Sequence, residues 1–145
     1  MEKENVIVVN NLYKSFKDND ILTGIGLTLQ RGENLGVVGK SGIGKSVLIK
    51  CIVRLIEPDY GEVNVLGTNV LECNEIELNE IRKKVGYLFQ GGALYDSMSV
   101  RENLLFPIRR TQFVDNKKDA EELIEGSLRS VGLLDAIDKM PSELS

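Results

Sequence analysis

The feature that most constrains the fold is the run Gly-Lys-Ser-Gly-Ile-Gly-Lys-Ser at residues 39–46. It fits the pattern G-x-x-x-x-G-K-[ST] in full, and the apolar run Asn-Leu-Gly-Val-Val at 34–38 leads straight into it. Such a run is typical of a strand buried on both faces. The next segment, 46–56, has helical length, and Pro58 follows where a proline cannot continue a helix. The order of strand, glycine loop and helix predicts an α/β fold.

The segments on either side of the glycine run add further elements to this prediction. The β-branched run at 6–9 and the alternating segment 21–29 are typical of paired, half-exposed strands. After the first helix, residues 59–67 are predicted to form a turn followed by a strand, and residues 76–84 a charged helix. Residues 85–89 read as a second strand buried on both faces. The sequence therefore predicts an α/β core with an N-terminal antiparallel β subdomain.

The C-terminal part of the chain predicts two more helices. Within 89–110, a loop leads into a helix that is capped by Ser97 or Ser99 and ends near Pro107. Between residues 115 and 133, apolar side chains recur at three- and four-residue spacing, which predicts an amphipathic helix. These apolar residues are Ala120, Leu123, Ile124, Leu128 and Val131.

Residues 116–119, Asn-Lys-Lys-Asp, resemble the motif with which GTPases read guanine. No buried strand delivers this motif, because 111–114 is short and mixed, and no Asp-x-x-Gly lies between it and the glycine run. A helix cap formed by Asp115 or Asn116 accounts for the same residues. The sequence therefore favours the start of a helix over a guanine site.

Composition and charge exclude several classes of protein. The chain has 18 Lys and Arg against 22 Asp and Glu, with both signs interspersed, so we expect no basic face for nucleic acid. No N-terminal segment resembles a secretory signal, and no run approaches the roughly 20 apolar residues of a membrane-spanning helix. Cys51 and Cys73 lack metal-ligand spacing, and the chain has no histidine. We expect a soluble cytoplasmic chain with reduced thiols.

The glycine run has the chemistry of a phosphate-binding loop, with a plain Gly/Ser turn before a helix as the alternative. Gly39, Gly42 and Gly44 let successive N–H groups point at phosphate oxygens, and the helix start adds partial positive charge. Lys45 is predicted to reach the β- and γ-phosphates, and Ser46 to offer its hydroxyl to Mg²⁺. The loop residues predicted to contact the nucleotide are Gly39, Lys40, Ser41, Gly42, Ile43, Gly44, Lys45, Ser46 and Val47.

The layout of the chain resembles the ATP-binding cassette (ABC) family, because 38 residues of largely antiparallel strand precede the loop. Asn-Leu-Tyr-Lys-Ser-Phe at 11–16 resembles the segment with the adenine-stacking aromatic, and Val-Gly-Tyr-Leu-Phe-Gln at 85–90 resembles the strand that ends in the family's glutamine. The resemblance implies a P-loop NTPase with an ABC-type ATPase core that binds ATP and Mg²⁺. It implies Phe16 as the adenine platform, with Tyr13 as the alternative. Many cassettes have tyrosine at this position, and phenylalanine keeps the stack without the hydroxyl.

The same resemblance bears on catalysis. It implies that Gln90 approaches Mg²⁺ and the attacking water, so Lys45 and Gln90 are the expected catalytic residues, and Ser46 and Gln90 the expected metal contacts. Pro-Ser-Glu-Leu-Ser at 141–145 resembles the lead-in to the family's signature, cut after its first two residues. Residues 1–145 are thus expected to be a partial ATP-binding domain, incomplete at its C-terminus, without the acidic Walker B motif and the switch histidine. We expect ATPase activity in the full-length form and negligible turnover by this chain alone.

The stretch 89–110 bears on the partners. It contains Phe-Gln-Gly-Gly-Ala-Leu-Tyr-Asp-Ser-Met-Ser-Val-Arg-Glu-Asn, and a loop that exposes Leu94, Tyr95 and Met98 is typical of a docking surface. The stretch resembles the cassettes of Mla-type lipid importers. The resemblance implies a membrane permease docked on 89–110, a second ATP-binding subunit in a head-to-tail dimer, and an MCE-type lipid-binding protein. It also implies a place at the cytoplasmic face of the inner membrane. An ABC protein of translation or repair and a P-loop kinase are the alternatives.

Overall fold

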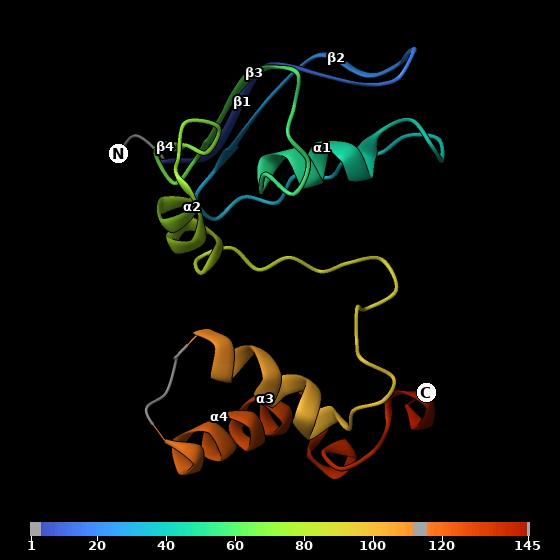
Figure 1. Ribbon diagram of the computed structural model, residues 1–145, viewed down its shortest axis with the longest axis vertical. Coiled ribbons are helices and arrows are strands. Elements are labelled where there is room, and N and C mark those ends of the chain that lie inside the picture. The colour runs from blue at the N-terminus through green and yellow to red at the C-terminus, as the bar shows by residue number, and fades with distance from the viewer. Residues whose placement is uncertain (1–3, 112–115, 145) are drawn as a thin grey trace. The chain divides into compact units, whose positions relative to one another are not determined.

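The computed structural model describes residues 4–111 and 116–144, and the chain divides into two units, an N-terminal unit up to Tyr87 and a C-terminal unit from Leu88 (Figure 1). Each unit is described by itself. The N-terminal unit carries a sheet, made of β1 (Asn5–Phe16), β2 (Asn19–Gln30), β3 (Tyr60–Val65) and β4 (Thr68–Asn69). It also carries the helices α1 (Lys45–Ile52) and α2 (Glu75–Arg82). The predicted strands at 6–9, 21–29 and 59–67 and the predicted helix at 76–84 are confirmed in this unit, whereas the helix predicted at 46–56 is confirmed only as far as Ile52.

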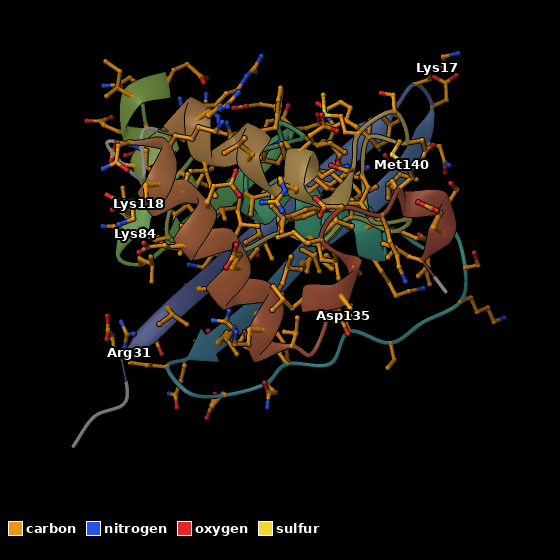
Figure 2. All side chains as sticks on the ribbon, turned by 90° about the horizontal axis from the view of Figure 1, so that it is seen from below. Lys17, Arg31, Lys84, Lys118, Asp135 and Met140 are labelled. Carbon is orange, nitrogen blue, oxygen red and sulfur yellow. The ribbon has the colours of Figure 1, made fainter. Side chains whose placement is uncertain are left out.

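The sheet has the order β2-β1-β3-β4, and its neighbouring strands run antiparallel. Val9 of β1 pairs with Leu27 of β2 on one side and with Val63 of β3 on the other. The long hairpin of β1 and β2 extends from Arg31 at one end to Lys17 at the turn (Figure 2). Its alternating sequence places one row of side chains in the core and the other in solvent, as a half-exposed strand pair requires.

A β-bulge interrupts β1 where it faces β3. The register shifts between Asn10 and Tyr13, and Asn11 adopts a positive φ of 47°. The opposite residue is Gly61, where a Cβ atom would lie 2.5 Å from the carbonyl oxygen of Asn11. Only glycine fits against this bulge, which bends β1 on its way to Phe16.

The core of the N-terminal unit lies between the sheet and its two helices. Leu48 and Cys51 of α1 and Leu78 of α2 are buried in it. The other buried members are Val9, Leu12, Leu22, Val63, Val65, Val70 and Cys73. Both cysteines are free thiols, as predicted. Two arginine side chains link α2 to the segments before and after it in space. Arg82 on α2 donates to the carbonyl of Arg54, just after α1, at 2.8 Å. The Arg54 guanidinium donates to the carbonyl of Cys73, just before α2, at 2.7 Å.

Two predicted buried strands are wrong in this structure. Residues 34–38 and 85–89 are irregular, and neither belongs to the sheet that the described residues form. Val38 is 93% exposed and Leu88 is 87% exposed. A strand buried on both faces needs a neighbouring strand for its backbone hydrogen bonds and helices over both faces of the sheet, and the described part of the chain pairs β1 to β4 only with one another. An apolar run therefore predicts a capacity for burial, which a neighbouring strand must complete.

The C-terminal unit is helical. It contains α3 (Val100–Thr111), α4 (Lys117–Ser130) and the short 3-10 helices η1 (Leu134–Ala136) and η2 (Pro141–Glu143). α3 packs against α4, and Arg101 of α3 pairs with Glu121 of α4 and, at 2.9 Å, with Asp138. None of the helices in residues 4–111 and 116–144 is long and apolar enough to span a membrane.

Ser99 is the cap of α3, as one of the two alternatives predicted. The N–H of Glu102 donates to the Ser99 hydroxyl at 3.3 Å, and the Glu102 carboxylate accepts from the Ser99 N–H at 2.8 Å. The predicted end of this helix is wrong, because Pro107 lies inside it and α3 continues to Thr111. A proline removes one intrahelical hydrogen bond, and the packing of α3 on α4 offsets that loss.

α4 confirms the amphipathic helix in its centre. Ala120, Ile124 and Leu128 are buried, whereas Leu123 and Val131 are exposed, so the predicted apolar stripe is narrower than its sequence pattern. The Asn116 side chain caps α4 by accepting from the Asp119 N–H at 2.9 Å. The helix start predicted in place of a guanine motif is confirmed, and the other candidate cap, Asp115, lies outside the described residues.

Candidate nucleotide-binding site

The glycine run forms a tight loop that ends at α1. Gly42 has a φ of 81° and Gly44 a φ of 106°, both in the left-handed region that favours glycine. Gly44 is also the N-cap of α1, and its carbonyl accepts the first helical hydrogen bond, from the Leu48 N–H at 2.9 Å. The loop therefore passes into the helix within one residue, and the first N–H groups of α1 face the loop.

Gly44 seats the loop on the sheet. A Cβ atom at this position would lie 2.7 Å from Cγ2 of Ile21 and 3.1 Å from the Ile21 carbonyl oxygen, both on β2. A Cβ atom on Gly42 would meet nothing within 4 Å. Gly44 is thus required for close approach and for its backbone angles, whereas Gly42 is required for its backbone angles alone.

Lys45 turns its ammonium back into the loop. Its Nζ atom donates to the carbonyl oxygen of Gly39 at 2.7 Å and to that of Lys40 at 2.6 Å. Ser46, the second residue of α1, is exposed beside it. The ammonium therefore lies where the loop curves, with a hydroxyl one residue away.

The electrostatics of the loop favour an anion. The first turn of α1 contains no acidic residue, and no side chain caps its N–H groups. The partial positive charge of the helix start therefore remains available and adds to the ammonium of Lys45. Backbone N–H groups, a helix start and an ammonium in one loop are the donors that bind phosphate oxygens.

The two candidate aromatics lie on β1, near its end. Phe16 is the last residue of the strand, pairs with Asn19 across the turn, and is 45% exposed. Tyr13 is similarly exposed, and its hydroxyl packs where a Cβ atom of Gly24 would lie, at 2.9 Å. The turn after Phe16 and the glycine loop lie at the same end of the N-terminal unit, on the right in Figure 1. The role of Phe16 as the platform for a base, with Tyr13 as the alternative, stays a prediction.

Gln90 belongs to the C-terminal unit, outside the loop's own unit. It is exposed at the start of that unit, in the irregular segment that precedes α3. Phe16, the loop, Lys45 and Ser46 all belong to the N-terminal unit. The approach of Gln90 to Ser46 and to a bound metal stays a prediction.

Lys14 and Asp59 are neighbours of the candidate site that the sequence interpretation missed. The Nζ atom of Lys14 lies 5.3 Å from the centroid of the Phe16 ring and 2.7 Å from the Asp59 carboxylate. Strand alternation could have suggested Lys14, which is two residues from Phe16. Asp59 is 43 residues from Phe16, and no local pattern joins them.

Comparison with known proteins places these features in a family. The sequence model described as "ABC transporter" matches residues 22–145. The chain is 37% identical over 141 residues to the protein TRIGALACTOSYLDIACYLGLYCEROL 3, chloroplastic, of Arabidopsis thaliana, covering 97% of this chain and 40% of that protein. It is 37% identical over 143 residues to the intermembrane phospholipid transport system ATP-binding protein MlaF of Haemophilus influenzae, covering 98% of this chain and 53% of that protein. It is also 38% identical to the methionine import ATP-binding protein MetN 4 of Oceanobacillus iheyensis, covering 97% of this chain and 41% of that protein.

Solved structures agree on the fold. The ATP-binding cassette MJ0796, a dimer bound to ADP and Pi, superposes with a TM-score of 0.84 at 25% identity, covering 96% of this chain and 63% of that one. The cbiO1 protein of Clostridium perfringens superposes with a TM-score of 0.80 at 21% identity, covering 99% and 57%, which shows the fold alone. The chain thus spans about half the length of the relatives that it matches. Its fold is that of the ABC ATPase cassettes, with an antiparallel β subdomain and a glycine loop before α1, and the chain belongs to the ABC transporter family.

Proposed function

We propose that this chain is the nucleotide-binding part of an ABC transporter ATPase subunit, and that it binds ATP with Mg²⁺ in the loop at 39–46. The observation that carries the proposal is the ammonium of Lys45 inside the glycine loop, within 2.7 Å of two of its carbonyl oxygens. Phosphate oxygens would take over the contacts of this ammonium, with the N–H groups of Gly44 and Lys45 beside them. The cassette MJ0796, which shares the fold, was solved with ADP and Pi.

Different residues of the chain are proposed to bind the phosphates, the adenine and Mg²⁺. The loop at 39–47 holds the phosphates, and the Phe16 ring offers its exposed face to the adenine. The Ser46 hydroxyl and the Gln90 amide oxygen have the oxygen chemistry that Mg²⁺ prefers, so both fit as its ligands. Bound Mg²⁺ would neutralise charge on the transferred phosphoryl group. Lys45 and Gln90 are the residues that we assign to catalysis.

Titration of the chain with MgATP in a calorimeter tests this site. Lys45→Ala should weaken binding at least about tenfold, because a charge-assisted contact to phosphate is removed. Lys50→Ala is the matched control, since it removes a lysine from the last turn of the same helix. Unchanged affinity in Lys45→Ala, or equal losses in both variants, would contradict the proposal.

We further propose that residues 89–110 dock on a membrane permease. In the C-terminal unit, a hollow on α3 is lined by Met98, Glu102, Leu105, Phe106, Arg109 and Arg110. The rings of Tyr95 and Phe106 meet edge-on with centroids 5.2 Å apart, and the Arg110 guanidinium lies 4.8 Å from the Phe106 centroid. Leu94 and Tyr95 are exposed beside them. An exposed patch of apolar and aromatic side chains with arginine has the composition of an interface.

Lipids are the substrate class that we propose for the transporter. The stretch 89–110 resembles Mla-type cassettes. The names of two relatives mention lipids: one names a galactolipid, and the other a phospholipid transport system. Other relatives are named for methionine import and for ribonucleotide transport. The proposed assembly is a head-to-tail dimer with a second ATP-binding subunit, on the cytoplasmic face of the inner membrane. It contains a permease and an MCE-type lipid-binding protein.

Co-expression with a candidate permease tests the assembly. The permease should co-purify with the chain, and Phe106→Ala together with Leu94→Asp should abolish this. Phosphate release by the purified 145-residue chain should stay at background, and should appear in a full-length form with its partners. Mg²⁺-dependent turnover by the chain alone that disappears in Lys45→Ala would contradict the expected inactivity of these residues by themselves.

A further inference from the structure

A cluster of hydrogen bonds holds the end of β1 directly before Phe16. The Lys14 ammonium donates to Oδ1 of Asp59 at 2.7 Å, and the Ser15 N–H donates to Oδ2 of the same carboxylate at 2.6 Å. The N–H of Asp59 itself donates to the carbonyl of Tyr13 at 2.9 Å. One aspartate therefore contacts three consecutive residues of the strand, through its side chain and its backbone.

The same lysine contacts the aromatic ring. The Nζ atom of Lys14 lies 5.3 Å from the Phe16 centroid, within the range of a cation–π contact. The Lys14 side chain is only 15% exposed and that of Asp59 35%, so solvent screens this ion pair less than it screens a pair on the open surface. A cation that is itself anchored by a carboxylate therefore holds the ring, whose remaining surface is open to solvent.

The Asp59 carboxylate of this pair is ionised at neutral pH. Hydrogen bonds from Lys14 and then from the Ser15 N–H hold the pKa of Asp59 below its usual value, so the carboxylate stays ionised. Burial raises the pKa of Cys51 on α1 to about 11, and the charge of Lys14 opposes part of this rise.

We propose that Lys14 and Asp59 are positioning residues for the nucleotide base: they hold the Phe16 ring at the orientation in which an adenine stacks on its open face. The inference rests on the proposed nucleotide site and adds to it two residues that do not touch the phosphates. Loss of either charge frees the ring and the strand end. The base contact then weakens, while the phosphate contacts of the loop remain.

A comparison of two ligands separates this role from a structural one. Tripolyphosphate carries the phosphates of ATP without the base, so we would measure the affinities of MgATP and magnesium tripolyphosphate for the same 145-residue chain by calorimetry. Lys14→Met and Asp59→Asn should weaken MgATP binding about threefold to tenfold and leave tripolyphosphate within about twofold. Phe16→Ala should show the same selective loss, about tenfold or more for MgATP. Lys14→Arg, which keeps the ion pair and the cation, should restore wild-type affinity.

Lys83→Met is the matched control, because Lys83 forms an ion pair with Glu80 on α2, at 2.6 Å. It should leave both ligands unaffected. Equal weakening of both ligands by Lys14→Met and Asp59→Asn would mean that the pair supports the fold only, and it would overturn the proposal, as would wild-type affinity for MgATP in both variants. Absence of tripolyphosphate binding in the wild-type chain would instead refute the nucleotide site itself.

A fluorescence measurement gives a second readout on the ring. The chain contains no tryptophan, so Phe16→Trp introduces a single reporter at the proposed platform. MgATP should quench this tryptophan and tripolyphosphate should not, because only the base stacks on it. Adding Lys14→Met should shift the quenching curve to about threefold higher MgATP. An unshifted curve would overturn the role of Lys14.

Discussion

Substitution of Gly44 by alanine tests how the glycine loop packs against the sheet. Gly44 has a φ of 106°, and an added Cβ atom would lie 2.7 Å from the Ile21 methyl carbon Cγ2 and 3.1 Å from the Ile21 carbonyl oxygen. Left-handed backbone costs an alanine about 1–2 kcal/mol, and overpacking against a side chain and a carbonyl adds about 1–3 kcal/mol. Gly44→Ala should therefore lower the free energy of unfolding by about 2–5 kcal/mol.

Gly42→Ala is the matched control for this substitution. Gly42 also has a positive φ, of 81°, but a Cβ atom there would meet nothing within 4 Å. The free energy of unfolding of this variant should fall only by the cost of the left-handed backbone, about 1–2 kcal/mol. The difference between the two variants then isolates the contact between the loop and β2, about 1–3 kcal/mol.

Urea unfolding of both variants, followed by circular dichroism, measures these losses. The m-value should stay unchanged, because the surface exposed on unfolding is the same. Magnesium tripolyphosphate titration adds a functional readout, in which Gly44→Ala should bind more weakly than Gly42→Ala. Equal destabilisation in the two variants would refute the reasoning, since it would leave backbone strain as the whole effect.

Three further predictions concern residues outside the glycine loop. Arg82→Met should cost about 2–4 kcal/mol in urea unfolding, because the guanidinium donates at 2.8 and 3.1 Å to two carbonyls just after α1, and Arg82→Lys should recover only part of it. Asn103→Ala should cost about 2–3 kcal/mol and speed hydrogen exchange at the Tyr95 amide, since the buried Asn103 amide accepts from that N–H at 2.8 Å; slow exchange at Tyr95 in the variant would contradict this. Burial raises the pKa of Cys51 from 9.0 to about 11, so between these values the native thiol keeps a proton that the unfolded thiol releases. Stability should fall there as the pH rises, by up to about 1.4 kcal/mol per pH unit, and Cys51→Ala should remove that part of the slope in urea unfolding at pH 8 to 11.

Local patterns predicted most of the helices and the antiparallel strands. The alternation at 21–29 predicts β2, and Ser99 followed three residues later by Glu102 predicts the start of α3, because both signals act within a few residues. The proline rule failed at Pro107, since packing of α3 on α4 outweighs one lost hydrogen bond. The rule for buried strands failed at 34–38 because the required tertiary contacts are missing: no strand of the described residues pairs with this segment.

The sequence by itself determined the glycine loop and its place before a helix. The spacing of Gly39, Gly44, Lys45 and Ser46 is local chemistry, in which glycine angles, a helix start and an ammonium need only each other. The tertiary structure alone decided which neighbours support that loop. Gly44 is required because β2 passes within contact distance, and the end of β1 is bound at Lys14 and Ser15 because Asp59, which follows α1 in the chain, returns to it. Contacts between residues distant along the chain depend on the path of the backbone in space, which no local pattern encodes.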